Sequence, residues 1–265
     1  MDLHGGSGVT PTKVAVQENI DQLRQKAKQG DAQAQFNLGL KYANGEGVAK
    51  DDKEAVAWYQ KAADQGYAQA QNNLGEMYRN GQNVAVDYHQ AAAWFQKAAD
   101  QGYASAQNNL GTMYADGIGM AQDYHQAMAW YQKAADQGFA KAQFNLGIMY
   151  ASGRGVARDD RQAVLWYQKA ADQGYAPAQT MFGMMYENGR GVPQDYVEAY
   201  AWITISAKKK NNILLAFIPL YRKVLQQEMT PAQIAAGEQR AKTLQARIEG
   251  GGARTAKAAV QEGID

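Results

Sequence analysis

Residues 104–139 read ASAQNNLGTMYADGIGMAQDYHQAMAWYQKAADQGF, and closely similar strings precede and follow this segment. The five tryptophans of the chain are spaced by 36 residues, at Trp58, Trp94, Trp130, Trp166 and Trp202. A fixed period of this length is typical of a repeat array, in which each copy contacts its neighbours. The copies occupy residues 32–67, 68–103, 104–139 and 140–175, and a fifth begins at Ala176.

The first half of each copy has the pattern of a helix with one apolar face. In the first copy, Ala34, Leu38 and Tyr42 are four residues apart, so they lie on the same side of a helix. Gly39 interrupts this helix at a cost of about 1 kcal/mol relative to alanine. We expect the close approach of a neighbouring helix to compensate. Gly45 stands where the helix must end, because glycine enters the left-handed region without steric cost.

The second half predicts another helix, antiparallel to the first. Asp51 and Glu54 form a predicted capping box, in which Asp51 caps backbone donors and Glu54 reaches back to the start of the helix. Trp58 and Ala62 follow at helical spacing, and Gly66 ends the segment. We expect the tryptophans to be core residues, and we expect the same of the methionine column at Met77, Met113, Met149 and Met185.

The pattern as a whole predicts an all-α solenoid of antiparallel helix pairs. We expect a disordered arm at 1–15, an N-terminal capping helix at 16–31, five repeats at 32–207, C-terminal capping helices at 208–249 and a flexible tail at 250–265. Pro219 is predicted to kink the first C-terminal capping helix, and Gly250–Gly252 to end the second. Residues 257–265 nearly duplicate residues 13–21, either as the start of another capping helix or as a cloning artefact.

Composition argues against several classes of partner. The formal net charge is +1, so no global field attracts nucleic acid or an anionic membrane. No apolar run reaches the roughly 18 to 20 residues of a transmembrane helix, and we predict neither nucleic-acid binding nor membrane insertion.

The N-terminus lacks a signal-peptide pattern. We therefore expect a cytoplasmic protein, or a periplasmic or secreted one if a signal peptide was removed.

No group of residues has the spacing of a catalytic or metal site. The chain has no cysteine, which excludes thiol catalysis and thiolate metal ligands. His89 and His125 occupy one position of neighbouring copies, without a second pair of ligands. The GxGV loops lack the preceding strand of a nucleotide site, and no serine lies in a nucleophile elbow. We expect no enzyme activity, no metal and no cofactor.

The repeated string AQNNLGxMYxxGxGVxxDYxxAxxWYQKAADQGYAxAQ resembles the Sel-one-like repeat (SLR) family, which is related to tetratricopeptide repeats. The resemblance covers residues 32–207, and the segment MTPAQIAAGEQRAK at 229–242 is similar to the helix that often closes such arrays. The resemblance implies a right-handed superhelical solenoid and a role as a scaffold or adaptor in protein complexes. Many bacterial members of the family are exported, and some engage host proteins.

By analogy with tetratricopeptide repeats, the first helices are expected to line a concave groove that binds a protein or peptide. The predicted partner-binding residues are Phe36, Asn37, Leu40, Asn72, Asn73, Glu76, Arg79, Asn108, Asn109, Thr112, Phe144, Asn145 and Ile148. One column of this set is asparagine in four copies. These amides could bind the backbone of an extended peptide, or each could bond a neighbouring turn and stabilise the stack.

The favoured hypothesis is therefore a non-enzymatic interaction module, which we expect to be a monomer. The near duplication of residues 13–21 at 257–265 leaves a self-assembling structural element as one alternative. A small hydrolase or ligand-binding protein is the other, although no nucleophile, base and orienting group occur together.

Overall fold

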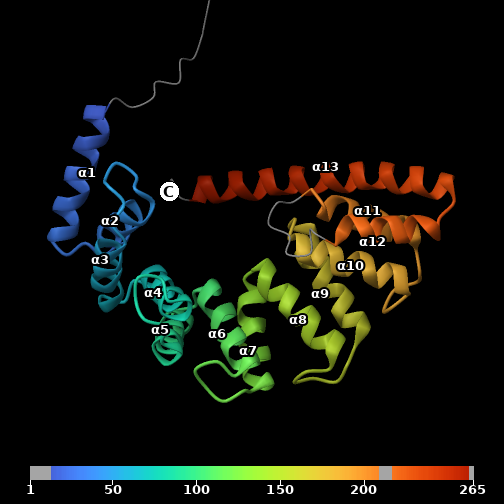
Figure 1. Ribbon diagram of the computed structural model, residues 1–265, viewed down its shortest axis with the longest axis horizontal. Helices are drawn as coiled ribbons and strands as arrows, with labels where there is room; N and C mark the ends of the chain where they lie inside the picture. Colours follow the sequence, from blue (N-terminus) through green and yellow to red (C-terminus); the bar gives the residue numbers. More distant parts are fainter. Residues whose placement is uncertain (1–12, 209–216, 263–265) are drawn as a thin grey trace, which may run out of the picture. The chain divides into compact units, whose positions relative to one another are not determined.

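The computed structural model describes residues 13–208 and 217–262, and this part of the chain is helical without strands (Figure 1). The helices are α1 (Lys13–Lys28), α2 (Ala32–Asn44), α3 (Asp52–Asp64), α4 (Ala68–Asn80), α5 (Tyr88–Asp100), α6 (Ala104–Asp116), α7 (Tyr124–Asp136), α8 (Ala140–Ser152), α9 (Asp160–Asp172), α10 (Ala176–Asn188), α11 (Tyr196–Ser206), α12 (Ile218–Gln227) and α13 (Pro231–Glu262). None of these helices is long and apolar enough to cross a membrane.

The chain divides into two compact units. Unit 1 comprises the residues up to Met113 together with Gly117–Ala121, and unit 2 comprises Tyr114–Asp116 together with the residues from Gln122 onward. In unit 1, α2 packs on α3 and α4 on α5, while in unit 2 α8 packs on α9 and α10 on α11. The predicted all-α architecture of helix pairs is confirmed.

The predicted aspartate caps the second helix of each pair, but the other half of the predicted capping box, the return bond from Glu54, is wrong. The Asp51 carboxylate accepts from the backbone N–H of Lys53 at 3.0 Å and of Glu54 at 3.1 Å. Glu54 Oε2 accepts instead from Trp58 Nε1 at 3.1 Å. The Asp51 N–H donates to the Tyr42 carbonyl at 3.0 Å, because this carbonyl at the end of α2 has no helical partner. The same backbone bond joins Asp87 to Tyr78, Asp123 to Tyr114, Asp159 to Tyr150 and Asp195 to Tyr186.

Three mid-helix glycines, Gly39, Gly75 and Gly147, face aromatic rings, as the expected close approach requires, while Gly183 faces Ile203. A Cβ atom on Gly39 would lie 2.7 Å from the ring of Tyr59 on α3. The corresponding distance from Gly75 to the Phe95 ring is 2.6 Å. The ring therefore occupies the space where any other residue would place its side chain, and this contact sets how closely the two helices of a pair approach.

Successive pairs are joined by a buried glutamine on each first helix. Gln71 Nε2 donates to the Ala63 carbonyl, at the end of the previous second helix, at 3.0 Å. Gln71 Oε1 accepts from Gln101 Nε2 at 2.7 Å. The first of these bonds recurs from Gln35 to Ala27, from Gln107 to Ala99, from Gln143 to Ala135 and from Gln179 to Ala171.

The tryptophans lie in the core, with one partial exception. Their exposed fractions are 8%, 7%, 9% and 2% at Trp58, Trp94, Trp130 and Trp202, whereas Trp166 is half-buried. A lysine ammonium lies over the ring in four cases, at 4.0 Å for Lys61 on Trp58. The predicted methionine column is buried at all four positions, Met77, Met113, Met149 and Met185.

The ends of the array differ in detail from the predictions. Residues 1–12 of the predicted arm and the segment 209–216 lie outside the described residues, but Lys13 already belongs to α1. Pro219 stands in the first turn of α12 instead of kinking a helix, because an N–H is not needed there. The predicted break at Gly250–Gly252 is also wrong, since α13 continues to Glu262. Glycine costs helix stability but does not forbid helical geometry.

The C-terminal helix α13 packs on α11 in unit 2. Ala241 and Leu244 are buried in the same cluster as Trp202. Two ion pairs also hold α13, from Arg240 Nε to Glu198 Oε1 on α11 at 2.6 Å and from Arg247 Nη2 to Asp172 Oδ1 at the end of α9 at 2.5 Å. This part of α13 therefore covers the apolar surface that the last repeat would otherwise expose.

An ion-pair cluster links the fourth and fifth repeats. Arg190 holds Asp160 through Nη2 to Oδ1 at 2.7 Å and Nε to Oδ2 at 3.2 Å, and Arg158 Nη2 lies 2.8 Å from Oδ2. Hydrogen bonds from Arg190 and Arg158 hold the pKa of the Asp160 carboxyl well below its usual range. The folded state therefore binds the Asp160 proton less tightly than the unfolded chain does.

We predict an acid-dependent contribution of Asp160 to stability. Because its folded-state pKa is depressed, the stabilisation is present above about pH 4 and is lost as the pH falls further. Urea denaturation of the wild type and Asp160→Asn should show a larger difference in unfolding free energy at pH 7 than at pH 3. The control is Asp52→Asn, at the same helix position of the first repeat, where Lys50 Nζ lies at 3.7 Å. An equal pH dependence for both variants would contradict the assignment.

A second prediction concerns the glycine–ring contacts. Gly75→Ala should destabilise the chain by about 1–3 kcal/mol, because the added methyl group overlaps the Phe95 ring. Gly250→Ala is the control, since no atom lies within 4 Å of its added Cβ and alanine favours the helix. Urea denaturation followed by circular dichroism measures both. A Gly75→Ala variant as stable as the wild type would show that the ring does not set the helix spacing.

Candidate functional site

The structure places all predicted partner-binding residues on the first helices of the pairs, and we call this surface the first-helix face. In unit 1 it comprises Phe36, Asn37 and Leu40 on α2, Asn72, Asn73, Glu76 and Arg79 on α4, and Asn108, Asn109 and Thr112 on α6. In unit 2 it comprises Phe144, Asn145 and Ile148 on α8. Most of these side chains are half-buried, while Asn72, Asn108 and Asn109 are buried.

A polar network on α4 and α6 brings four of the predicted residues together. Asn109 Nδ2 donates to Asn72 Oδ1 at 3.1 Å and to Glu76 Oε1 at 3.2 Å. Asn72 Nδ2 also donates to Glu76 Oε1, at 3.2 Å. On the other side, Arg79 Nη1 donates to Asn109 Oδ1 at 3.5 Å. The Asn109 amide therefore contacts a carboxylate and a guanidinium and holds both at the surface of unit 1.

The surroundings of these two charges are aromatic. The Arg79 guanidinium lies over the Phe95 ring at 5.6 Å. Burial raises the pKa of the Tyr103 hydroxyl, and the neighbouring Glu76 carboxylate raises it further. Tyr103 directly precedes α6 and was not among the predicted residues. The signal for it was present in the sequence, because an aromatic residue follows the glycine that ends each of the first four repeats.

The asparagine column is not uniform. Asn109 is 3% exposed and fully engaged in the network. Asn73 hydrogen-bonds the Tyr59 hydroxyl, whose pKa is raised by burial and partly lowered again by this bond. Asn37 and Asn145 are half-buried. The stacking interpretation thus describes Asn109 well, whereas a peptide-binding role of the column stays a prediction.

The two predicted phenylalanines pack partly against their own repeats. The Phe36 ring centroid lies 5.6 Å from that of Tyr59 and 5.2 Å from that of Tyr67. Phe144 makes the same contacts with Tyr167 at 5.8 Å and Tyr175 at 5.4 Å. Both remain half-buried, so part of each ring is still accessible.

The first-helix face of unit 2 is mainly apolar where it is accessible. Phe144 and Ile148 on α8 and Met181 on α10 are partly buried around one core cluster, and Met184 is half-buried one turn after Met181. Met181 and Met184 were not among the predicted residues, although they occupy the asparagine and leucine columns of the fifth repeat. The two units therefore present different chemistry on equivalent helices.

The described residues include no group of three or more histidine, cysteine, aspartate or glutamate side chains that could hold a metal ion. His89 and His125 are both exposed near the start of second helices. The accessible chemistry of the first-helix face consists of amides, one carboxylate, one guanidinium, the hydroxyl of Thr112 and apolar side chains.

Comparison with known proteins gives consistent matches. A family model described as Sel1 repeat matches residues 32–67, 68–103, 104–139, 140–175 and 176–211. A solved Sel1 repeat protein from Oxalobacter formigenes is 33% identical, with a TM-score of 0.71, over 86% of this chain and 93% of that one. The protective antigen c5321 of uropathogenic Escherichia coli, described as having an SLR fold, is 38% identical with a TM-score of 0.71 over 86% of this chain.

Two of these relatives are longer proteins. The chain spans 49% of the c5321 structure. The secretory immunoglobulin A-binding protein EsiB of Escherichia coli is 44% identical over 44 residues, which are 17% of this chain and 9% of that protein.

We predict that Asn109 contributes to stability. Asn109→Ala should cost about 1–3 kcal/mol, because Asn72 and Glu76 lose a buried donor. Asn37→Ala, in the same column but half-buried, should cost much less. Chemical denaturation measures both, and equal losses would contradict the division of the column into structural and accessible members.

Proposed function

Because the chain belongs to the Sel1-repeat family, we propose that it is a non-catalytic binding protein that takes up a segment of a partner protein on its first-helix face. Sel1-repeat proteins generally mediate protein–protein interactions. Repeat proteins of this kind keep constant residues for stacking and vary the residues of an extended binding surface. In this chain the constant columns include the buried glutamines, the mid-helix glycines and the tryptophans. The first-helix face combines the nearly constant asparagine column with columns that vary between repeats.

The polar network of unit 1 is the observation that carries the proposal. Glu76 and Arg79 are half-buried, and neither forms an ion pair with another described residue of the chain. Instead, the Asn109 amide holds both in place. Charged groups that are fixed in advance bind a complementary partner with little loss of side-chain entropy. The network therefore suits a peptide segment that carries both a basic and an acidic group.

Unit 2 supplies a surface of a second kind. Phe144, Ile148, Met181 and Met184 present accessible apolar area on α8 and α10. Methionine adapts its shape to different apolar side chains, so this surface suits aliphatic or aromatic anchors of a partner. Each unit by itself thus offers a distinct contact to a protein ligand.

The relatives support the class of ligand and leave its identity open. EsiB is named for binding secretory immunoglobulin A, and its matched segment is 44 residues long. Since the chain spans 49% of the c5321 structure, the activity of that longer protein is not transferred here. A protein or peptide ligand is proposed, without nucleic acid, cofactor or membrane insertion.

The proposal is tested by selecting ligands from a random peptide library displayed on phage and measuring their affinities by calorimetry. For peptides with a basic and an acidic residue, the double variant Glu76→Gln/Arg79→Gln should bind at least about tenfold more weakly, because each lost charge-assisted hydrogen bond is worth about 1.5–3 kcal/mol.

The control is Lys53→Gln/Glu238→Gln, which makes the same change in charge at two exposed positions on α3 and α13. It should leave the affinity unchanged. Equal affinity for the wild type and both double variants would place the ligand elsewhere, and the proposal would fail.

A further inference from the structure

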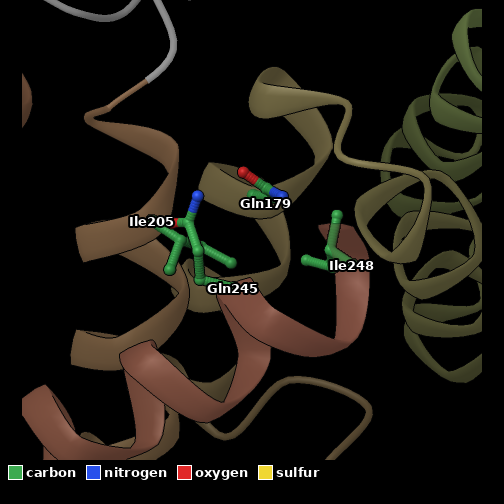
Figure 2. Close-up of a pocket in the computed structure, with 4 residues that line it drawn as sticks. All are labelled: Gln179, Ile205, Gln245 and Ile248. Atoms are coloured by element: carbon green, nitrogen blue, oxygen red, sulfur yellow. The ribbon is translucent and has the colours of Figure 1, made fainter. Parts of the chain in front are cut away.

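We propose that a water molecule binds between α10 and α13 and bridges the amide oxygens of Gln179 and Gln245. Figure 2 shows the site, with Gln179 from α10, Ile205 from α11, and Gln245 and Ile248 from α13 around a small cavity. The two oxygens, Gln179 Oε1 and Gln245 Oε1, are buried, and neither has a hydrogen-bond partner among the described residues. This inference does not depend on the proposed function.

The missing donor follows from the end of the repeat pattern. In three other repeats the glutamine at this position accepts a hydrogen bond from the glutamine that follows the second helix. These bonds run from Gln65 to Gln35 at 2.7 Å, from Gln101 to Gln71 at 2.7 Å and from Gln173 to Gln143 at 2.8 Å. One period after Gln173, the donor position holds Lys209, which lies outside the described residues. Gln179 therefore lacks the glutamine amide that donates to its counterparts in those three repeats.

The orientation of both amides is assigned from the hydrogen bonds of their nitrogen atoms. Gln179 Nε2 donates to the Ala171 carbonyl at 3.1 Å, so its oxygen must face the cavity. Gln245 Nε2 donates to Glu249 Oε1 at 2.5 Å, and a rotated amide would set its oxygen against that carboxylate. The acceptors on the nitrogen side therefore favour the orientation in which each oxygen points away from them. Two buried amide oxygens on residues that line the cavity are left without a donor among the described residues.

The volume of the cavity and the two acceptor oxygens indicate which ligand fits. The cavity leaves about 10 Å³ for a water-sized molecule, which corresponds to a single site. A ligand that serves two acceptor oxygens must donate two hydrogens. Water does so, and an ammonium ion offers the same chemistry. The isoleucines on either side supply no competing polar group. The bridge would take the place of the glutamine–glutamine bond and tie α13 to the last repeat.

The test is a high-resolution crystal structure of the full chain, grown without ammonium. It should show a single solvent peak within hydrogen-bonding distance of both oxygens. The same peak in ammonium-free crystals identifies water, whereas a peak that requires added ammonium salt would overturn the assignment to water. An empty cavity would overturn the proposal, and so would a direct bond from Gln245 Nε2 to Gln179 Oε1 or the Lys209 ammonium in the site.

Two variants complete the experiment. Gln245→Met removes one acceptor and should abolish the peak, while Gln239→Met, at an exposed position of the same helix, should retain it. Circular dichroism confirms that both variants remain folded. A peak that persists unchanged in Gln245→Met would show that Gln245 does not bind the water, and the bridge would be disproved.

Discussion

The buried glutamine of each first helix is the interaction on which the stack depends. Its nitrogen binds a carbonyl at the end of the preceding second helix, as Gln71 does with Ala63. A buried amide without hydrogen-bond partners lowers the stability of the folded state. Each repeat therefore depends on a neighbouring repeat to supply the partners of its glutamine. All four buried side-chain polar atoms that lack a partner in the described part of the chain belong to α10–α13, where the repeat pattern ends. In the described part of the chain, the buried side-chain polar atoms of the inner repeats therefore have hydrogen-bond partners, and those without one lie at the C-terminal end of the array.

This dependence separates the residues that hold the array from those that are free to differ. Tyr59, Phe95 and Tyr167 fill the space next to three of the glycines, and four of the tryptophans lie under lysine ammonium groups. The accessible positions of the first-helix face carry no such requirement, so α4 can present Glu76 and Arg79 while α8 and α10 present Ile148 and Met184. Constant stacking residues combined with variable accessible residues are the property that lets one fold serve many functions.

Most of the fold could be predicted from the sequence, because period, caps and glycines are local signals. The contacts between helix pairs could not be predicted from the sequence, because the string AxAQ does not show that its glutamine bridges two repeats. Pro219 and Gly250–Gly252 were misjudged because their usual effect depends on helix position and context. For the candidate site, the helices and columns were predictable. The burial of Asn109, its bonds to Glu76 and Arg79, and the nearby Tyr103 required coordinates, because they depend on which residue a neighbouring repeat places opposite.

The central claim is that the first helices carry the binding surface and the second helices do not. Photo-crosslinking in the source cells tests it directly, with a photoreactive amino acid at Ile148 on α8 or, as the matched aliphatic position, at Leu165 on α9, which is 50% exposed. A crosslinked partner protein is expected from position 148 and not from position 165. Crosslinks from position 165 alone would contradict the account and place recognition on the opposite helices.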